Sequence, residues 1–290
     1  MSYAALALVV LAAFIHAGWN LLSKRAADAG PSFVFAYNLF CCVLYAPWVA
    51  WVIAEGATAW TLPVLACILV TGTVHLAYSL SLQRGYQVAD LSVVYPVARG
   101  TGPAVSTLGA FLLLGEAPTA NGIAGLLFVV LGIGLISTQA DLAAFRRPGG
   151  LAGLRWGLLT GLLIAAYTVV DAYGVKELGI HPVVLDWCCN FLRFVLLAPL
   201  VMRAPRRAIA RMRGRWLLAV GVGVLSPLSY ILVLMALDMR APLSVVAPMR
   251  EMSMMVGALF GMALLHEPVG KWRLIGCLVL VVGVVLLGSA

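Results

Sequence analysis

The sequence predicts an all-α integral membrane protein, with ten transmembrane helices arranged as two inverted five-helix repeats. Three observations predict this fold: the composition, the number of long apolar runs, and a pattern that occurs twice along the chain. Apolar residues make up 63% of the chain and charged residues 10%, whereas soluble domains hold about 25% charged residues. The mean hydropathy is +1.04. This composition excludes an ordinary soluble domain.

Ten apolar runs are each long enough to cross a bilayer, which takes about 20 residues of helix. They cover residues 3–23, 31–53, 61–83, 90–113, 119–138, 153–173, 182–202, 216–237, 242–264 and 270–288. Gly, Pro and charged residues separate most of them, while only the segment QRGYQVAD divides the third from the fourth. The first run lacks the basic start and cleavage site of a signal peptide, so we expect it to be a retained span.

The basic residues outside the spans predict the orientation of the chain. Loops after odd-numbered spans hold Lys24, Arg25, Arg84, Arg146, Arg147, Arg155, Arg203, Arg206, Arg207, Arg211, Arg213, Arg215, Lys271 and Arg273. Loops after even-numbered spans hold only Lys176 and Arg240. Short loops rich in Lys and Arg stay in the cytoplasm, so we expect both termini on the periplasmic side of a bacterial inner membrane. The net charge of +8 then reflects topology and contact with anionic lipid head groups, and we expect no nucleic-acid partner.

The six cysteines predict neither a metal site nor a disulfide. All of them lie inside apolar runs, and none shows the C-x-x-C or Cys/His spacing of a ligand set. We expect them to be buried small apolar residues. No metal and no cofactor are expected.

The chain repeats itself with an offset of 152 residues. LSVVYP at 91–96 recurs as LSVVAP at 243–248. The other matches, the last two after a one-residue gap, are Asn38 with Asn190, Pro47 with Pro199, Tyr78 with Tyr230, Arg99 with Arg250 and Glu116 with Glu267. Five spans per repeat make the second repeat insert upside down, an architecture that places a transporter's substrate site between the halves. We expect a first repeat over 1–138, a cytoplasmic connector over 139–152 and a second repeat over 153–290.

Several of these segments together resemble a known family. They are HAGWNLLSK in the first span, FLRFVLLAPL in the seventh, the two LSVV-P segments, LLLGEAP at 112–118 and ALLHEP at 263–268. The whole chain is similar to the drug/metabolite transporter superfamily, and specifically to its ten-helix EamA branch. The resemblance implies transport of small organic solutes, usually metabolites or toxic amphiphiles, and usually export. One position departs from the repeat, because Cys41 stands where the second half has Arg193.

Two arginines lie deep within spans and follow prolines. Pro96 precedes Arg99, and Pro248 precedes Arg250. Each proline removes a backbone donor, so we expect both spans to kink there. An arginine at this depth must be paired or hydrated. Two interpretations stay open: a guanidinium that binds a carboxylate or phosphate of the solute, or an internal salt bridge.

Three acidic residues are candidates for proton coupling or ion pairing. Glu251 lies near the middle of its span, where it is a proton carrier, a counter-ion for an amine, or a partner of Arg99 or Arg193. Asp171 and Asp186 lie near span ends. For these two, a functional role and simple contact with the membrane interface both stay open.

Histidines and aromatic residues complete the predicted site. In the first span, His16, Trp19, Asn20 and Ser23 share one helix face, and we expect them to line the cytoplasmic half of a cavity with Lys24 at its mouth. In the third span, His75 and Tyr78 share a face with Ser79. Histidine suits proton coupling, although a neutral core histidine is the alternative. Predicted aromatic cavity residues in other spans are Tyr95, Tyr167 and Tyr230.

The leading prediction is a carrier that exports a small metabolite by alternating access, without enzymatic activity. The family resemblance makes amino-acid-like or amphipathic solutes the leading class. The alternative within transport is a proton-coupled exporter of cationic drugs or amines. Outside transport, the alternatives are a membrane-embedded lipid-modifying enzyme and an accessory subunit; no clustered catalytic residues support the enzyme. We expect a monomer whose partners are a small solute and membrane lipid.

Overall fold

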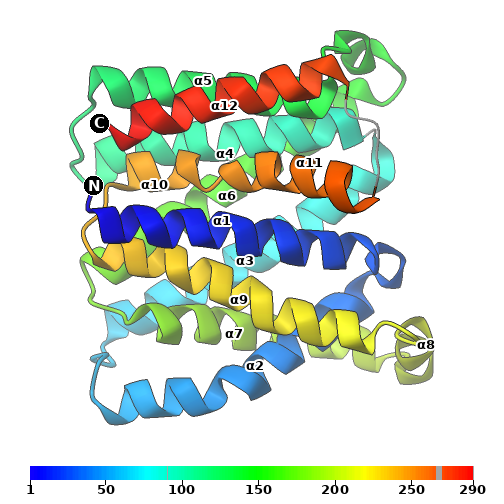
Figure 1. Ribbon diagram of the computed structural model, residues 1–290. Helices are drawn as coiled ribbons and strands as arrows, with labels where there is room; N and C mark the ends of the chain where they lie inside the picture. The colour runs from blue at the N-terminus through cyan, green and yellow to red at the C-terminus, as the bar shows by residue number, and fades with distance from the viewer. Residues whose placement is uncertain (90, 266–269, 290) are drawn as a thin grey trace.

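The chain folds as a bundle of roughly parallel and antiparallel helices in the computed structural model, which describes residues 1–89, 91–265 and 270–289 (Figure 1). The two termini lie at the same end of the bundle, here named the terminal end, and the short helix α8 lies at the opposite, basic end. The connections that follow α1, α5 and α7 lie at the basic end. Because both termini lie at the same end, the chain crosses the bundle an even number of times, as ten spans require.

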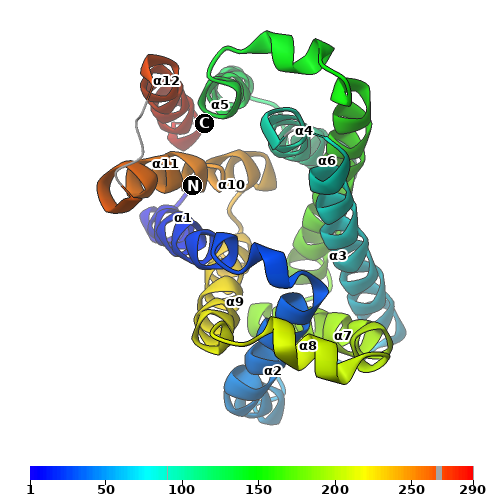
Figure 2. The same cartoon turned by 90° about the vertical axis from the view of Figure 1, so that its right-hand side faces the viewer.

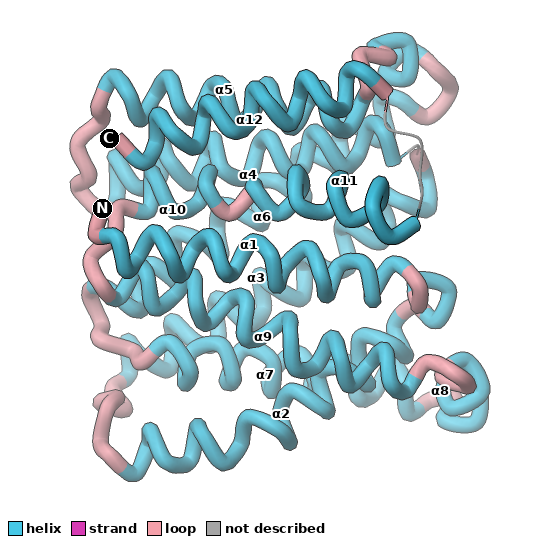
Figure 3. Tube along the Cα trace, in the orientation of Figure 1, coloured by secondary structure: helices cyan, strands magenta, loops and turns pink. Residues whose placement is uncertain are grey.

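The first half holds α1 (Tyr3–Lys24), the 3₁₀ turn η1 (Ala27–Ala29), α2 (Pro31–Ala54), α3 (Leu62–Val88), α4 (Leu91–Leu113) and α5 (Ala120–Thr138). The second half follows the 3₁₀ turn η2 (Leu142–Arg146) and holds α6 (Gly150–Lys176), α7 (Pro182–Met202), α8 (Pro205–Arg211), α9 (Trp216–Asp238), α10 (Leu243–Met249), α11 (Met252–Leu265) and α12 (Lys271–Gly288). The structure contains no strand within the described residues (Figure 3).

The helices agree closely with the predicted spans. Within the described residues, nine segments are long and apolar enough to cross a membrane, and α10 with α11 counts as one of them. Helix α4 is outside this set, because Arg99, two prolines and several glycines lower its hydropathy, but it lies alongside the others in the bundle. Helix α8, within the basic connector, was not predicted.

The two halves are related as an inverted repeat. Helices α1 and α6, which are counterparts, run in opposite directions along the bundle, and so do α5 and α12 (Figure 1). The packing follows the same symmetry: α4 packs on α6 as α11 packs on α1, and α3 packs on α6 as α9 packs on α1. Viewed along the bundle, helices of both halves surround its centre (Figure 2). The predicted architecture is confirmed.

Small residues bring α4 and α6 close together. Gly153, Gly157 and Gly161 stand four residues apart on α6 and lie against α4. A Cβ at Gly161 would come within 2.6 Å of the Thr101 Cβ and 2.9 Å of the Ala98 carbonyl oxygen. Such small-residue spacing lets membrane helices pack with their backbones in near contact. This close packing joins α4 of the first half to α6 of the second half.

The predicted kinks behave differently in the two repeats. The ninth span is interrupted between α10 and α11, directly after Pro248, at Arg250 and Glu251. There Glu251 N–H donates to the Pro248 carbonyl at 3.1 Å, a bond over three residues instead of four. The equivalent α4 continues as a helix through Pro96 and Pro103. The second half thus has a helix break after its proline, whereas α4 is one helix across Pro96 and Pro103.

Candidate solute site

Two arginines and one glutamate meet between the halves. We name Arg99 of α4 and Arg250 and Glu251 of the α10–α11 break the central triad. Arg99 Nε lies 3.0 Å from Glu251 Oε2, and Arg250 Nε lies 3.9 Å from Glu251 Oε1. All three side chains are buried, Glu251 completely. The helix break lets the side chains of adjacent residues Arg250 and Glu251 approach each other, whereas an uninterrupted helix would point them about 100° apart.

The structure shows which of the proposed ion-pair partners Glu251 contacts. It is the ion-pair partner of Arg99, and no ion pair with Arg193 is seen among the described residues. Arg99 also donates to Ser253 Oγ at 3.4 Å and lies 5.7 Å from the centre of the Tyr95 ring. Two guanidinium groups face one carboxylate, so an ionised triad carries one excess positive charge. Arg250 Nε has no hydrogen-bond partner within the described part of the chain.

A second polar cluster surrounds Asp171 of α6. Thr71 of α3 donates to Asp171 Oδ1 at 2.5 Å, and the Tyr230 hydroxyl of α9 donates to Oδ2. His75 Nε2 lies 3.9 Å from the same Oδ2. Asp171 is only 1% exposed, because it points into the protein. The suggestion that Asp171 simply reaches the membrane interface is wrong.

Aromatic rings cover one side of this cluster. The Tyr167 ring stacks on the His75 ring with centres 3.8 Å apart. Tyr78 and Tyr230 meet Tyr167 edge-on at 5.6 and 6.3 Å. Of the predicted cavity residues, these four come together from α3, α6 and α9. They form an aromatic cluster beside Asp171.

The polar face of α1 contacts α9 and its own helix, and His16 interacts electrostatically with Arg99 and Arg250. Trp19 Nε1 donates to Ser229 Oγ of α9 at 3.2 Å, and Asn20 Nδ2 donates to the His16 carbonyl of its own helix at 2.9 Å. The His16 ring packs edge-on against Trp19, with centres 4.7 Å apart. Among the described residues, no hydrogen bond joins this face to the triad or to Asp171. Ser23 is half-buried, and the Lys24 side chain lies outside the described residues.

Sequence reasoning left the role of Asp186 open and did not identify Asn190 or Thr71 as neighbours of the buried carboxylates. Asn190 Nδ2 donates to Asp186 Oδ2 at 2.9 Å, and Arg193 donates to Asn190 Oδ1. Asp186 is buried as well, so contact with the interface does not explain it either. The i, i+4 spacing of Asp186 and Asn190 was a signal that could have found this pair. Thr71 carried no such signal, because threonine is common in apolar spans.

One group of side chains has metal-ligand chemistry. His75, Asp171 and Cys189 offer ligand atoms within 4.8 Å of one another, from three different helices. Both oxygens of Asp171 already accept protein hydroxyls, and His75 Nδ1 lies 3.0 Å from the Thr71 carbonyl. We therefore assign no ion to them. All six cysteines are free thiols, which agrees with the absence of predicted disulfides.

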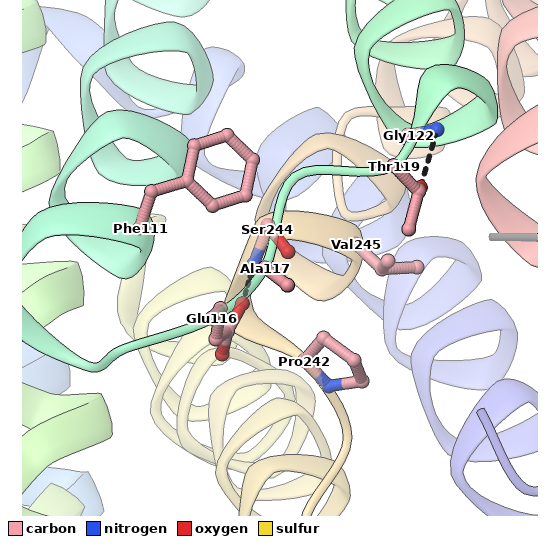
Figure 4. A pocket seen from close by; sticks show the side chains of 8 residues that line it. All are labelled: Phe111, Glu116, Ala117, Thr119, Gly122, Pro242, Ser244 and Val245. Carbon is pink, nitrogen blue, oxygen red and sulfur yellow. Dashed lines mark hydrogen bonds between the residues drawn. The ribbon is translucent and has the colours of Figure 1, made fainter.

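A pocket of about 230 Å³ opens at the terminal end, away from the triad. Glu116, Thr119, Pro242 and Ser244 are among its lining residues (Figure 4). Glu116 caps a helix of the other half: its carboxylate accepts from the Leu243 and Ser244 amides. Its sequence counterpart Glu267 lies outside the described residues.

Comparisons with known proteins agree with this architecture. The model of the EamA-like transporter family matches the chain twice, over residues 3–138 and 151–289. No curated protein matches significantly. A solved structure titled only "Crystal structure of protein" is similar over 100% of this chain and 98% of its own, with a TM-score of 0.78 at 14% identity. That likeness shows the fold alone. With both repeats matched by the family model, the chain belongs to the EamA-like transporter family of the drug/metabolite transporter superfamily and is a multi-pass membrane transporter.

Proposed function

We propose that the chain is a secondary transporter that moves a small organic metabolite by alternating access between its two repeats. The supporting observation is the central triad, in which buried charges from both halves meet at a helix break. Broken helices at the interface of inverted repeats are typical of solute sites in secondary transporters. Buried intramembrane charges are costly and mark such sites by default.

The charge of the triad favours a solute with a carboxylate. Glu251 neutralises one of the two arginines and lies closer to Arg99, so the guanidinium of Arg250 is the group available to an anion. A planar guanidinium binds carboxylate through paired hydrogen bonds. The amine of an amino-acid-like solute would then find Asp171 and the face of Tyr167, since Arg250 interacts electrostatically with both residues.

A proton-coupled exporter of cationic amines is the second candidate. The observation that favours it is the pair His75 and Asp171, whose Nε2 and Oδ2 atoms lie 3.9 Å apart. A proton taken up at His75 Nε2 would be held by the carboxylate and exchanged against an amine. Because Glu251 is paired with Arg99, Asp171 is the better binding carboxylate in this case.

The remaining assignments rest on the family and on charge. We propose export, a location in a bacterial cytoplasmic membrane, and termini on its outer side. The concentration of Lys and Arg in loops at the basic end supports this orientation. We propose that one chain, with repeats 1–138 and 153–290 joined by 139–152, is the working unit.

Flux into liposomes tests the function directly. The purified protein would be reconstituted and supplied with amino acids, amines and phosphorylated metabolites, with and without an imposed pH gradient. We expect flux of a carboxylated, amino-acid-like solute. Flux of amines alone, driven by the gradient, would favour the second candidate, and catalytic turnover of a lipid without any flux would contradict transport.

A further inference from the structure

A largely buried polar contact between the halves lies at the terminal end, outside the central site. Glu116, in the segment between α4 and α5, accepts hydrogen bonds from Lys176 Nζ at 2.9 Å, Leu243 N at 2.6 Å and Ser244 N at 2.9 Å. Lys176 is the last residue of α6, while Leu243 and Ser244 are the first residues of α10. One carboxylate of the first half thus holds two elements of the second.

The contact is well shielded from solvent. The side chain of Glu116 is 13% exposed and that of Lys176 is 9% exposed. At the basic end, the described ion pair that joins the halves is Asp28 with Arg215, whose side chains are 69% and 28% exposed. Solvent weakens such exposed pairs, so the Glu116 contact is the stronger of the two.

Helix α10 has no cap of its own at this end. Its N-cap residue is Pro242, which makes no side-chain capping bond. The first backbone amides of a helix need acceptors from outside the helix, and Glu116 supplies them from the other half. The close-up of the pocket shows the carboxylate directed at Ser244 (Figure 4). Helix α10 leads to Arg250 and Glu251, so the capped helix ends at the central triad.

We propose that Glu116, Lys176 and the first amides of α10 form a latch that closes the terminal end and must open in each transport cycle. The proposal rests on alternating access as the proposed function. In alternating access the halves rock against each other around a central site, so contacts that tie the halves together at one end break when that end opens. Breaking this latch frees α10 from α4–α5 and α6 at the same time.

Thiol labelling from each side of the membrane tests the latch without a known solute. Ala247→Cys, buried in α10 beyond the latch, reports opening of the terminal end, and Ser23→Cys on α1 reports access at the basic end. A membrane-impermeant maleimide is applied to one side at a time. Peptide mass spectrometry reads each thiol separately from the native cysteines.

Glu116→Gln keeps the size of the side chain and removes its charge. We expect the rate at which Ala247→Cys is labelled from the terminal side to rise about ten- to a hundred-fold. This factor corresponds to the loss of one hydrogen bond to a charged group. Labelling of Ser23→Cys from the opposite side should fall, because the ends open alternately. The matched control is Glu177→Gln, which removes an exposed carboxylate beside Lys176 and should change neither rate more than about twofold.

Lys176 supplies a second test if Glu116→Gln does not fold. Lys176→Met should act like Glu116→Gln, and Lys176→Arg should label like wild type. Unchanged labelling in both Glu116→Gln and Lys176→Met would overturn the latch. A faster labelling of Ala247→Cys without a slower labelling of Ser23→Cys would also overturn it, because local loosening of α10 alone gives that pattern. If labelling responds as expected but no solute is transported, the proposed solute class fails and the latch stands.

Discussion

At the residue scale, the protein is organised around charges that are buried and paired. The depth of Arg99, Arg250 and Glu251 within their spans was predictable from sequence, because hydropathy shows where each span begins and ends. Their pairing was not, since it depends on the rotation of α4 against the α10–α11 break. The same holds for Asp171, whose acceptance of bonds from Thr71 and Tyr230 depends on how three helices pack.

Removing the Tyr230 hydroxyl tests the Asp171 cluster. Tyr230→Phe leaves one carboxylate oxygen without its hydroxyl donor, and a hydrogen bond to a charged group contributes about 1.5–3 kcal/mol. We expect a loss of that order in the free energy of unfolding, measured in detergent. The control is Tyr173→Phe, on the same helix α6 as Asp171 but 46% exposed, which should be within about 0.5 kcal/mol of wild type. Equal effects of the two changes would contradict the assigned role of Tyr230.

Glu116 gives a pH dependence with a defined sign. Burial would raise the pKa of Glu116, but hydrogen bonds from Ser244, Lys176 and Leu243 outweigh it and hold the pKa below the ordinary 4.5. A depressed carboxyl pKa adds stability above the unfolded-state pKa and loses it as the pH falls through the folded-state pKa. Wild type should therefore exceed Glu116→Gln in melting temperature at neutral pH, and the gap should close below pH 4.5. If the difference in melting temperature between wild type and Glu116→Gln instead widened as the pH fell, this would contradict hydrogen bonds to an ionised Glu116.

At the element scale, one repeated motif has two outcomes. LSVVYP and LSVVAP both place a proline at the sixth position of a helix, yet α4 continues through it and α10 ends shortly after it. Helix α4 is held against the glycines of α6, whereas Glu251 at the α10–α11 break pairs with Arg99 and lies 3.9 Å from Arg250. The proline in the sequence does not predict whether the helix continues or breaks, because that depends on the residues against which each helix packs.

The contact of α4 with α6 predicts a contrast between two glycines. Gly161→Ala places a Cβ within 2.6 Å of the Thr101 Cβ, whereas a Cβ at Gly134 of α5 meets nothing within 4 Å. Overpacking of this kind typically costs about 1–3 kcal/mol, while Gly→Ala in an open helical position adds helix propensity. We expect Gly161→Ala to lower the melting temperature and Gly134→Ala to keep or raise it. A neutral Gly161→Ala would show that α4 and α6 separate easily.

At the scale of the whole molecule, the sequence predicted most of the architecture. The offset of 152 residues and the odd number of spans per repeat led to an inverted repeat, which the packing confirms. The latch between Glu116 and α10 was beyond sequence reasoning, because it joins residues 127 positions apart in different halves.

The distribution of basic residues predicts the topology. A reporter that works only in the cytoplasm should be active when inserted in the loop 203–215 and inactive when fused to either terminus. The reason is that short loops rich in Lys and Arg are retained inside. Activity at the termini and none in the loop would contradict the proposed orientation.

The most direct test of the central claim, that the triad binds the solute, measures flux and thermal unfolding on the same three variants. Arg250→Leu should reduce transport of a carboxylated solute by roughly thirty- to several-thousand-fold, since losing a buried charged contact costs about 2–5 kcal/mol. The protein should stay folded, because Glu251 keeps Arg99 as its partner. Glu251→Gln should destabilise the fold by leaving two buried arginines. The double variant Arg250→Leu/Glu251→Gln should recover only part of that stability, because Arg99 is still without its carboxylate, and it should not recover flux. Full flux with wild-type stability in all three variants would contradict the account.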